Sequence, residues 1–193
     1  MGRAASAVQL LCTVGVMTGT PAVLHAQELV VNGGFESGNF FPWWVPPSIP
    51  NESRFYVSPA AEFAHSGSHY AYLSSTSLQY IGQVLPTAAG VDYELSFWVR
   101  RVSLAPDQFK VRWEGQLVFN EFTINLDWDV WQHRTIPLEA NITGSFLEFG
   151  QDHFPGAFFL DDVSVTQIVP APSAATLLGV AGLVGLRRRR ARH

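Results

Sequence analysis

Two pairs of carboxylates in this chain have the residue types that a glycoside hydrolase uses for acid–base chemistry: Asp127 with Asp129, and Glu148 with Asp152. That chemistry depends on the distance between two carboxylates in space, which sequence spacing does not give. The histidines of the central region lack the spacing of a recognised metal motif, and no serine lies in a Gly-x-Ser-x-Gly elbow. We therefore predict no catalytic residues and keep a small glycan-active hydrolase only as the second of two alternatives.

The six tryptophans offer a different chemistry, because the apolar face of a sugar ring stacks on an indole. A small sandwich buries most of its aromatic rings, and we expect Trp131, at the start of a strand, to fill the core. Four other tryptophans lie among prolines, in an acidic loop or opposite an apolar strand face, where exposure is expected. We predict these four as glycan-binding residues: Trp43, Trp44, Trp98 and Trp128.

Charge and cysteine usage limit the possible partners. All 16 acidic residues lie between positions 27 and 168 with six basic ones, so this region has a net charge of −10. Nucleic acid is excluded as a partner because its phosphates require clustered cations, whereas neutral glycans or divalent cations are compatible. Cys12 is the only cysteine and precedes this region, so the core must be stable without disulfides.

Apolar and polar residues alternate along most of the central region, which is typical of strands. Residues 93–99 alternate strictly, and Glu114-Gly115 between two short apolar runs is a two-residue hairpin signal. No long stretch has helical spacing. The other predicted strands are 29–32, 55–58, 70–74, 78–84, 109–113, 116–119, 131–138, 145–149 and 157–166. The sequence thus predicts an all-β fold, an antiparallel β-sandwich (jelly roll), in one domain spanning residues 27–168.

Three segments together resemble the galactose-binding-like jelly roll found in many carbohydrate-binding modules. They are Leu-Val-Val-Asn-Gly-Gly-Phe-Glu at 29–36, His-Ser-Gly-Ser-His-Tyr-Ala-Tyr-Leu at 65–73 and Phe-Leu-Asp-Asp-Val-Ser-Val at 159–165. The resemblance spans nearly all of residues 28–165. It implies the fold more strongly than the ligand, because this framework serves glycan binders, lipid binders and structural modules alike.

The same resemblance implies one structural calcium ion where the first and last strands meet. Glu36 and Asp161 would supply carboxylates, joined by backbone carbonyls of Asn32, His65 and Gly67, and such hard oxygen donors suit calcium. Strand parity with the valines that follow Asp161 places its side chain toward the core, where a carboxylate needs a cation or hydrogen bonds. The alternative is that Asp161 caps a turn and Glu36 is solvated.

Residues 1–26 have the layout of a secretory signal peptide. Arg3 precedes a short apolar run at 4–16, and a small residue, Ala26, ends the segment. Cleavage after Ala26 would begin the mature chain at Gln27.

Residues 169–193 resemble a PEP-CTERM sorting signal, the substrate of exosortase-type membrane proteases. The tripeptide Pro170-Ala171-Pro172 precedes an apolar run at 174–186, and the family usually has Glu at the position of Ala171. The run is shorter than the roughly 20 residues of a stable span, so we expect transient inner-membrane anchoring, with a permanent tail anchor as the alternative. The Arg-rich end, 187–193, contains the four adjacent cations Arg187, Arg188, Arg189 and Arg190.

These inferences predict an exported protein of the cell envelope or the extracellular space. Its partners would be an exosortase-type protease and a polysaccharide, which a non-catalytic jelly roll binds. The alternative is a purely structural surface or matrix protein without glycan affinity.

Overall fold

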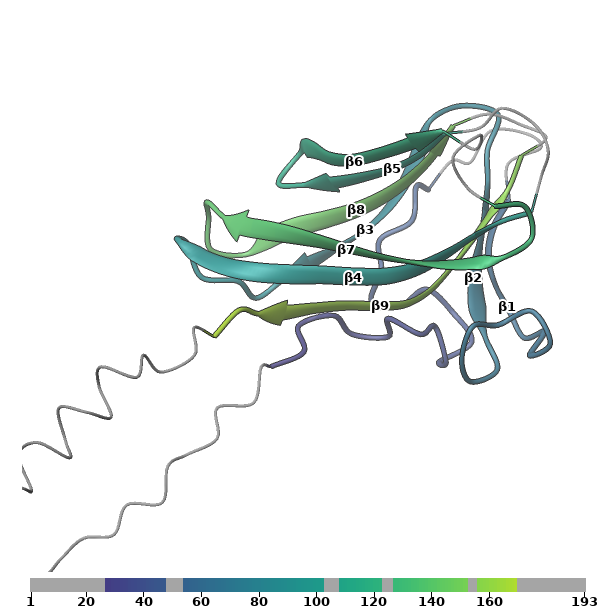
Figure 1. The fold of residues 1–193 in the computed structure, drawn as a ribbon, viewed down its shortest axis with the longest axis horizontal. Coiled ribbons are helices and arrows are strands. Elements are labelled where there is room, and N and C mark those ends of the chain that lie inside the picture. The colour runs from purple at the N-terminus through teal and green to yellow at the C-terminus, as the bar shows by residue number, and fades with distance from the viewer. Residues whose placement is uncertain (1–26, 48–53, 103–107, 123–126, 153–155, 170–193) are drawn as a thin grey trace, which may run out of the picture.

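The computed structural model describes residues 27–47, 54–102, 108–122, 127–152 and 156–169. Within these ranges nine strands form two antiparallel sheets, one ordered β1-β2-β9-β4-β7 and one ordered β3-β8-β5-β6 (Figure 1). The strands are β1 (Arg54–Ser58), β2 (Tyr70–Ser74), β3 (Gln79–Leu85), β4 (Val91–Arg101), β5 (Gln108–Trp113), β6 (Gln116–Phe122), β7 (Trp131–Ala140), β8 (Ser145–Asp152) and β9 (Phe158–Gln167). The predicted all-β sandwich is confirmed.

The predicted hairpin joins β5 and β6. Glu114 and Gly115 both have positive φ, 51° and 76°, the conformation that a two-residue turn between antiparallel strands requires. The predicted strand at 29–32 is the exception, because only Glu28 makes an isolated bridge there, with Thr166 of β9. Asn32 turns the backbone away at φ 58°, which ends the extended segment.

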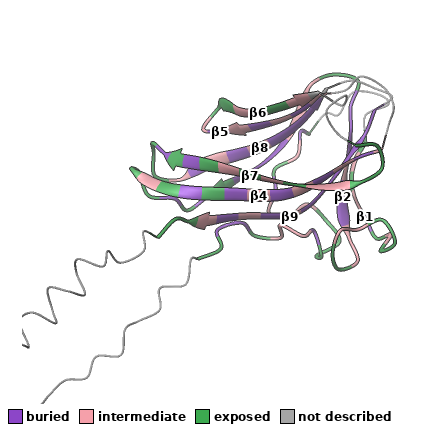
Figure 2. Cartoon of the chain, in the orientation of Figure 1, coloured by how far each residue is buried: buried purple, intermediate pink, exposed green. Residues whose placement is uncertain are grey.

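The core lies between the two sheets and is rich in phenylalanine. Along β4 the residues of one face, from Tyr93 to Val99, are buried, and Figure 2 shows the resulting alternation along the strand. Phe97 contacts Phe109 and Phe149, with ring centroids 5.8 Å and 5.2 Å apart, and all three rings are fully buried. Aromatic packing of this kind supplies stability in a domain without disulfides.

A register shift in the five-stranded sheet changes which way one carboxylate points. The pairing of β4 with β9 slips near Trp98, and Asp162 adopts φ 48°. Leu160 and Val163 therefore both face the core, although they are three residues apart. Asp161 pairs with Trp98, whose side chain lies on the outer face, so Asp161 does not point into the core between the sheets as predicted. It is nevertheless fully buried, and the backbone N–H groups of the turn at 65–66 supply the hydrogen bonds that a buried carboxylate needs.

In the part of the chain that the structure describes, no helix is long and apolar enough to cross a membrane. Residues 1–26 and 170–193, which hold the two predicted targeting segments, lie outside the described ranges.

Candidate functional site

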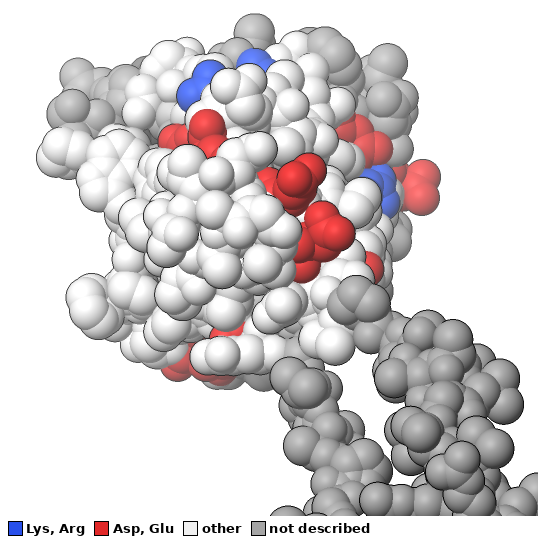
Figure 3. All heavy atoms as spheres, turned by 90° about the vertical axis from the view of Figure 1, so that its left-hand side faces the viewer, with Lys and Arg blue, Asp and Glu red and all other residues white. Residues whose placement is uncertain are grey.

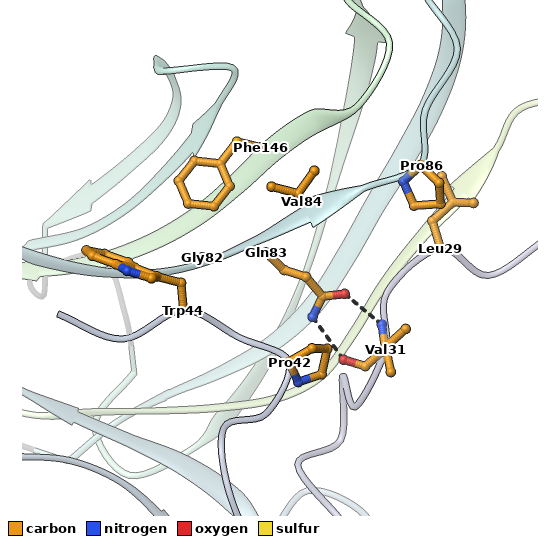
Figure 4. A pocket seen from close by; sticks show the side chains of 9 residues that line it. All are labelled: Leu29, Val31, Pro42, Trp44, Gly82, Gln83, Val84, Pro86 and Phe146. Atoms are coloured by element: carbon orange, nitrogen blue, oxygen red, sulfur yellow. Dashed lines mark hydrogen bonds between the residues drawn. The ribbon is translucent and has the colours of Figure 1, made fainter. Parts of the chain in front are cut away.

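A groove of about 320 Å³ lies on the outer face of the four-stranded sheet. Its walls include Pro42, Trp44, Val84 and Phe146, whose side chains appear together in Figure 4. Trp44 joins the edge of β3, because its backbone N–H donates to the Gly82 carbonyl at 2.6 Å and its carbonyl accepts from the Gly82 N–H at 3.0 Å. This pairing holds an indole that is 52% exposed over the sheet.

Two glycines in the middle of strands shape this outer face. A Cβ atom on Gly82 would lie 2.5 Å from the Phe146 ring, and one on Gly150 would overlap the Tyr80 ring. The two rings therefore cover the backbone of these glycines. Glycine in a strand interior weakens the strand but permits such close approach.

The buried side-chain amide of Gln83 holds Val31 in place, and Val31 belongs to the N-terminal segment that forms one wall of the groove. The Val31 N–H donates to Gln83 Oε1 at 2.9 Å, and Gln83 Nε2 donates to the Val31 carbonyl at 3.0 Å, as the dashed lines in Figure 4 mark. The side chain thus copies the hydrogen bonds of a neighbouring strand. Because both groups of the amide are satisfied, its burial is tolerated.

Polar groups continue the same face beyond the rings. Arg112 is paired across the strands with Glu148, and its guanidinium lies 4.4 Å from the Tyr80 ring centroid. Burial raises the pKa of Glu148, and Arg112 opposes part of that rise. The face thus combines apolar rings with one charged donor and one acceptor, which is what orienting a polyhydroxylated ligand requires.

The described surface carries more acidic than basic side chains, as the net charge of −10 for residues 27–168 predicts. Figure 3 shows acidic side chains spread over one end of the domain, with basic ones near its upper edge and at its right-hand side. Asp129, one of the carboxylates considered for catalysis, forms an ion pair with Arg100 at 2.6 Å. Glu148 lies on β8, and the side chain of Asp152 lies outside the described ones.

The structure separates the two adjacent tryptophans of the proline-rich segment. Trp43 is only 4% exposed and packs against Phe35 and Phe149, with its Nε1 donating to the Asn32 carbonyl at 3.1 Å. Its predicted exposure is wrong, because successive residues of an extended segment point to opposite sides. Trp44 is exposed as predicted.

The remaining tryptophans lie elsewhere. Trp128 is exposed (56%) but does not line the groove that contains Trp44. Trp98 is partly exposed on the outer face of the five-stranded sheet, where the His65 ring stacks on it at 3.8 Å. Trp131 also lies on that outer face and donates to the Phe63 carbonyl at 3.1 Å, so its predicted place in the core is wrong. It begins an edge strand whose buried residues come only at the far end.

The carboxylates predicted to bind calcium hold the turn at residues 65–69. Asp161 Oδ2 accepts the backbone N–H groups of His65 and Ser66, at 2.9 Å and 3.3 Å, and Oδ1 accepts that of Asp162. Glu36 Oε1 accepts two further N–H groups of the turn, and its Oε2 accepts a serine hydroxyl. All four oxygens already have donors.

These hydrogen bonds affect the two carboxylates differently. Burial and the neighbouring charge of Asp162 raise the pKa of Asp161 to about 6 despite its N–H donors. Glu36 loses some solvation too, but hydrogen bonds from Ser68 and His69 outweigh that loss and lower its pKa to about 2. Two turn-capping carboxylates thus titrate in separate pH ranges.

The predicted calcium donors already have hydrogen-bond partners within the protein. The carbonyl of Asn32 already accepts two N–H groups, from Phe35 and from the Trp43 indole. Among the residues that the structure describes, no three His, Cys, Asp or Glu side chains are grouped to hold a metal ion. Calcium binding stays a prediction from the sequence, and the geometry assigns Asp161 and Glu36 to turn capping.

Comparison with solved structures places this fold among known proteins. TmCBM61 in complex with β-1,4-galactotriose matches with a TM-score of 0.58 and 21% identity, over 74% of this chain and 99% of that one. The CBM22-1 xylan-binding domain of Xyn10C from Paenibacillus barcinonensis matches with a TM-score of 0.55 and 18% identity, over 76% and 97%. The enzymatically active domain of tailspike protein 4 from bacteriophage CBA120 matches with a TM-score of 0.56 and 13% identity, over 73% and 21%.

At these identities the likeness establishes the jelly-roll fold. No family model and no curated protein matches the sequence.

Sequence reasoning missed several residues of the candidate site, namely Tyr80, Arg112 and Phe146. The signal that could have found two of them is the isolated glycine in each strand pattern, Gly82 and Gly150, because such a glycine marks close approach of another group.

Proposed function

We propose that the domain binds a neutral polysaccharide, without catalysis, on the outer face of the four-stranded sheet. The observation that supports this most directly is the half-exposed indole of Trp44 beside Phe146 in a shallow groove. A pyranose ring has an apolar face that stacks on such a surface, and each aromatic contact contributes about 1 kcal/mol.

Neighbouring polar groups would orient the sugar. Arg112 offers N–H donors and Glu148 offers an acceptor, on the same sheet face as the rings. The net charge of −10 for residues 27–168 disfavours polyanions, so the proposed ligand is an uncharged glycan. Two of the structural neighbours are a galactotriose complex and a xylan-binding domain, which supports the same ligand class.

Affinity electrophoresis of the full chain through gels containing galactan, xylan or other neutral polysaccharides tests this proposal. We expect at least one polymer to retard the protein, and Trp44→Ala to weaken binding by roughly 5- to 30-fold, the equivalent of about 1–2 kcal/mol. Trp128→Ala is the matched control, because Trp128 has a similar exposure and does not line this groove. If no polysaccharide retards the wild type, a purely structural role replaces the proposal.

We also propose that the protein is exported and sorted to the cell envelope or beyond by an exosortase-type protease. The support is in the sequence alone: a signal-peptide layout at 1–26 and a PEP-CTERM-like end at 169–193. Intact mass spectrometry of the protein from its native cells should show a chain lacking both segments. Recovery of all 193 residues would contradict the proposal, and retention of the C-terminal segment alone would favour a permanent tail anchor.

A further inference from the structure

A second groove, of about 280 Å³, lies on the opposite outer face, that of the five-stranded sheet. Strand register places one row of side chains across all five strands, since each residue pairs with the next. The row consists of Tyr56, Tyr72, Phe159, Arg100 and Trp131. The first three are aromatic residues on adjacent strands that line one side of the groove, and their rings contact one another in turn.

The rings of this row are ordered by stacking. Tyr56 and Tyr72 lie nearly parallel, with centroids 4.7 Å apart, and Tyr72 contacts Phe159 at 5.6 Å. Burial raises the pKa of both tyrosines, so their phenols stay uncharged and can donate hydrogen bonds. Tyr56 is 45% exposed and presents a ring to solvent.

The other side of the groove is polar and charge-balanced. Arg100 donates to Asp129 from Nε and Nη2, and its guanidinium lies 5.6 Å from the centroids of both Phe63 and Phe159. Phe63 comes from the loop between β1 and β2, which Asp161 and Glu36 hold through the turn at 65–69. The carboxylates predicted to bind calcium thus position a wall of this groove.

We propose that this groove is a second glycan-binding site, so that one domain binds two polysaccharide chains, one on each outer face, and cross-links them. The inference rests on the proposed function. The groove pairs flat uncharged rings with donors and an acceptor, the same combination as the Trp44 groove, and its ion pair leaves no net charge for a charged ligand. Its size suits one or two sugar rings.

Two sites on opposite faces change what binding achieves. The sandwich core separates the grooves, so one short oligosaccharide cannot occupy both. Two long polymers can each take one face, and many weak contacts along them add up through avidity.

Isothermal titration calorimetry of the full chain, with an oligosaccharide cut from the polysaccharide that retards the wild type, tests the inference. We expect two oligosaccharides per chain at a ligand concentration that just saturates the wild type. At that concentration Tyr56→Ala and Trp44→Ala should each bind one, because a roughly 5- to 30-fold loss leaves the altered site mostly empty, and the double variant should bind almost none. Ile142→Ala, an exposed residue outside both grooves, should leave two. Phe63→Ala provides a second variant on the loop, should Tyr56→Ala fail to fold.

Turbidity of the intact polysaccharide supplies the second readout. The wild type should cross-link the polymer, and each single variant should lose cross-linking while still binding. One oligosaccharide per chain, abolished by Trp44→Ala and unaffected by Tyr56→Ala, would overturn the second site and leave the proposed function intact. Two oligosaccharides per chain in both Tyr56→Ala and Phe63→Ala would also overturn the second site. No binding by the wild type would overturn the second site and the proposed function together.

Discussion

The two outer faces of the sandwich present aromatic rings by different means. On the four-stranded sheet, Phe146 and Tyr80 lie over glycines, so their positions depend on a missing side chain. On the five-stranded sheet, Tyr56 and Tyr72 stack on each other, and a loop held by carboxylates completes the groove. Substitutions that add a side chain at the glycines should therefore disturb the first face, whereas a change of pH, which titrates the carboxylates, should disturb the second.

The largest effect we expect is a difference in stability between a substitution in the core and one in the groove. Trp43→Ala removes a buried indole and its hydrogen bond, and should lower the free energy of unfolding by about 3–5 kcal/mol. Trp44→Ala, one residue away, should cost less than about 1 kcal/mol of stability while weakening polysaccharide binding. Urea unfolding of both variants measures this difference. Equal losses of stability would mean that Trp44 is also a core residue.

The second prediction concerns pH and the five-stranded face. The pKa of Asp161 is raised to about 6 from an ordinary 3.8, so the folded state holds the proton more tightly than the unfolded state. The stabilisation from this group is complete below about pH 4 and is lost as the pH rises through 6, by at most about 3 kcal/mol. Urea unfolding across this range should show that fall in the wild type but not in Asp161→Asn.

Glu36 provides the opposite case in the same turn. Its pKa is lowered to about 2 from 4.5, so the stability that it contributes is present above pH 4.5 and is lost as the pH falls toward 2. Glu36→Gln should remove that acid-side loss only. If the Asp161 and Glu36 variants alter the free energy of unfolding over the same pH range, the two carboxylates do not act independently.

The third prediction tests the glycines of the four-stranded face. A methyl group on Gly150 would overlap the Tyr80 ring, so Gly150→Ala should destabilise the fold by about 1–3 kcal/mol through overpacking. In a Tyr80→Ala background the same change should cost much less, because the overlapping ring is gone. An equal cost in both backgrounds would show that the ring does not depend on the glycine.

The smallest expected effect is that of calcium. Because all four oxygens of Glu36 and Asp161 already accept hydrogen bonds, we expect the melting temperature to be the same in excess calcium and in chelator. A calcium-dependent rise that Asp161→Ala abolishes would restore the metal site predicted from the sequence. Glu114→Ala is the control, because Glu114 caps a distant turn at residues 141–142 in the same way.

Alternation of apolar and polar residues was enough to predict most strands, because a half-buried strand such as β4 shows the pattern residue by residue. It could not predict the orientation of Asp161, since a register shift changes strand parity without a mark in the sequence. It also could not decide which of Trp43 and Trp44 is buried, because the proline-rich segment around them shows no alternation of apolar and polar residues.

The candidate site was harder to predict than the fold. Trp44 was found by its type and its neighbours, but Phe146 and Tyr80 are placed by glycines on partner strands, more than 60 residues away in each case. Only the pairing of β3 with β8 brings those residues together, and pairing partners are not visible in a single sequence.

Hydroxyl-radical footprinting of the full chain, with and without the polysaccharide that it binds, tests the central claim most directly. Trp44 and Trp128 are similarly exposed, at 52% and 56%, and should oxidise at similar rates in the free protein, while Trp43 is protected throughout. We predict that polysaccharide protects Trp44 and leaves Trp128 unchanged. Oxidation of Trp44 that is unaffected by a bound polysaccharide would contradict the assignment of the four-stranded face as the binding surface.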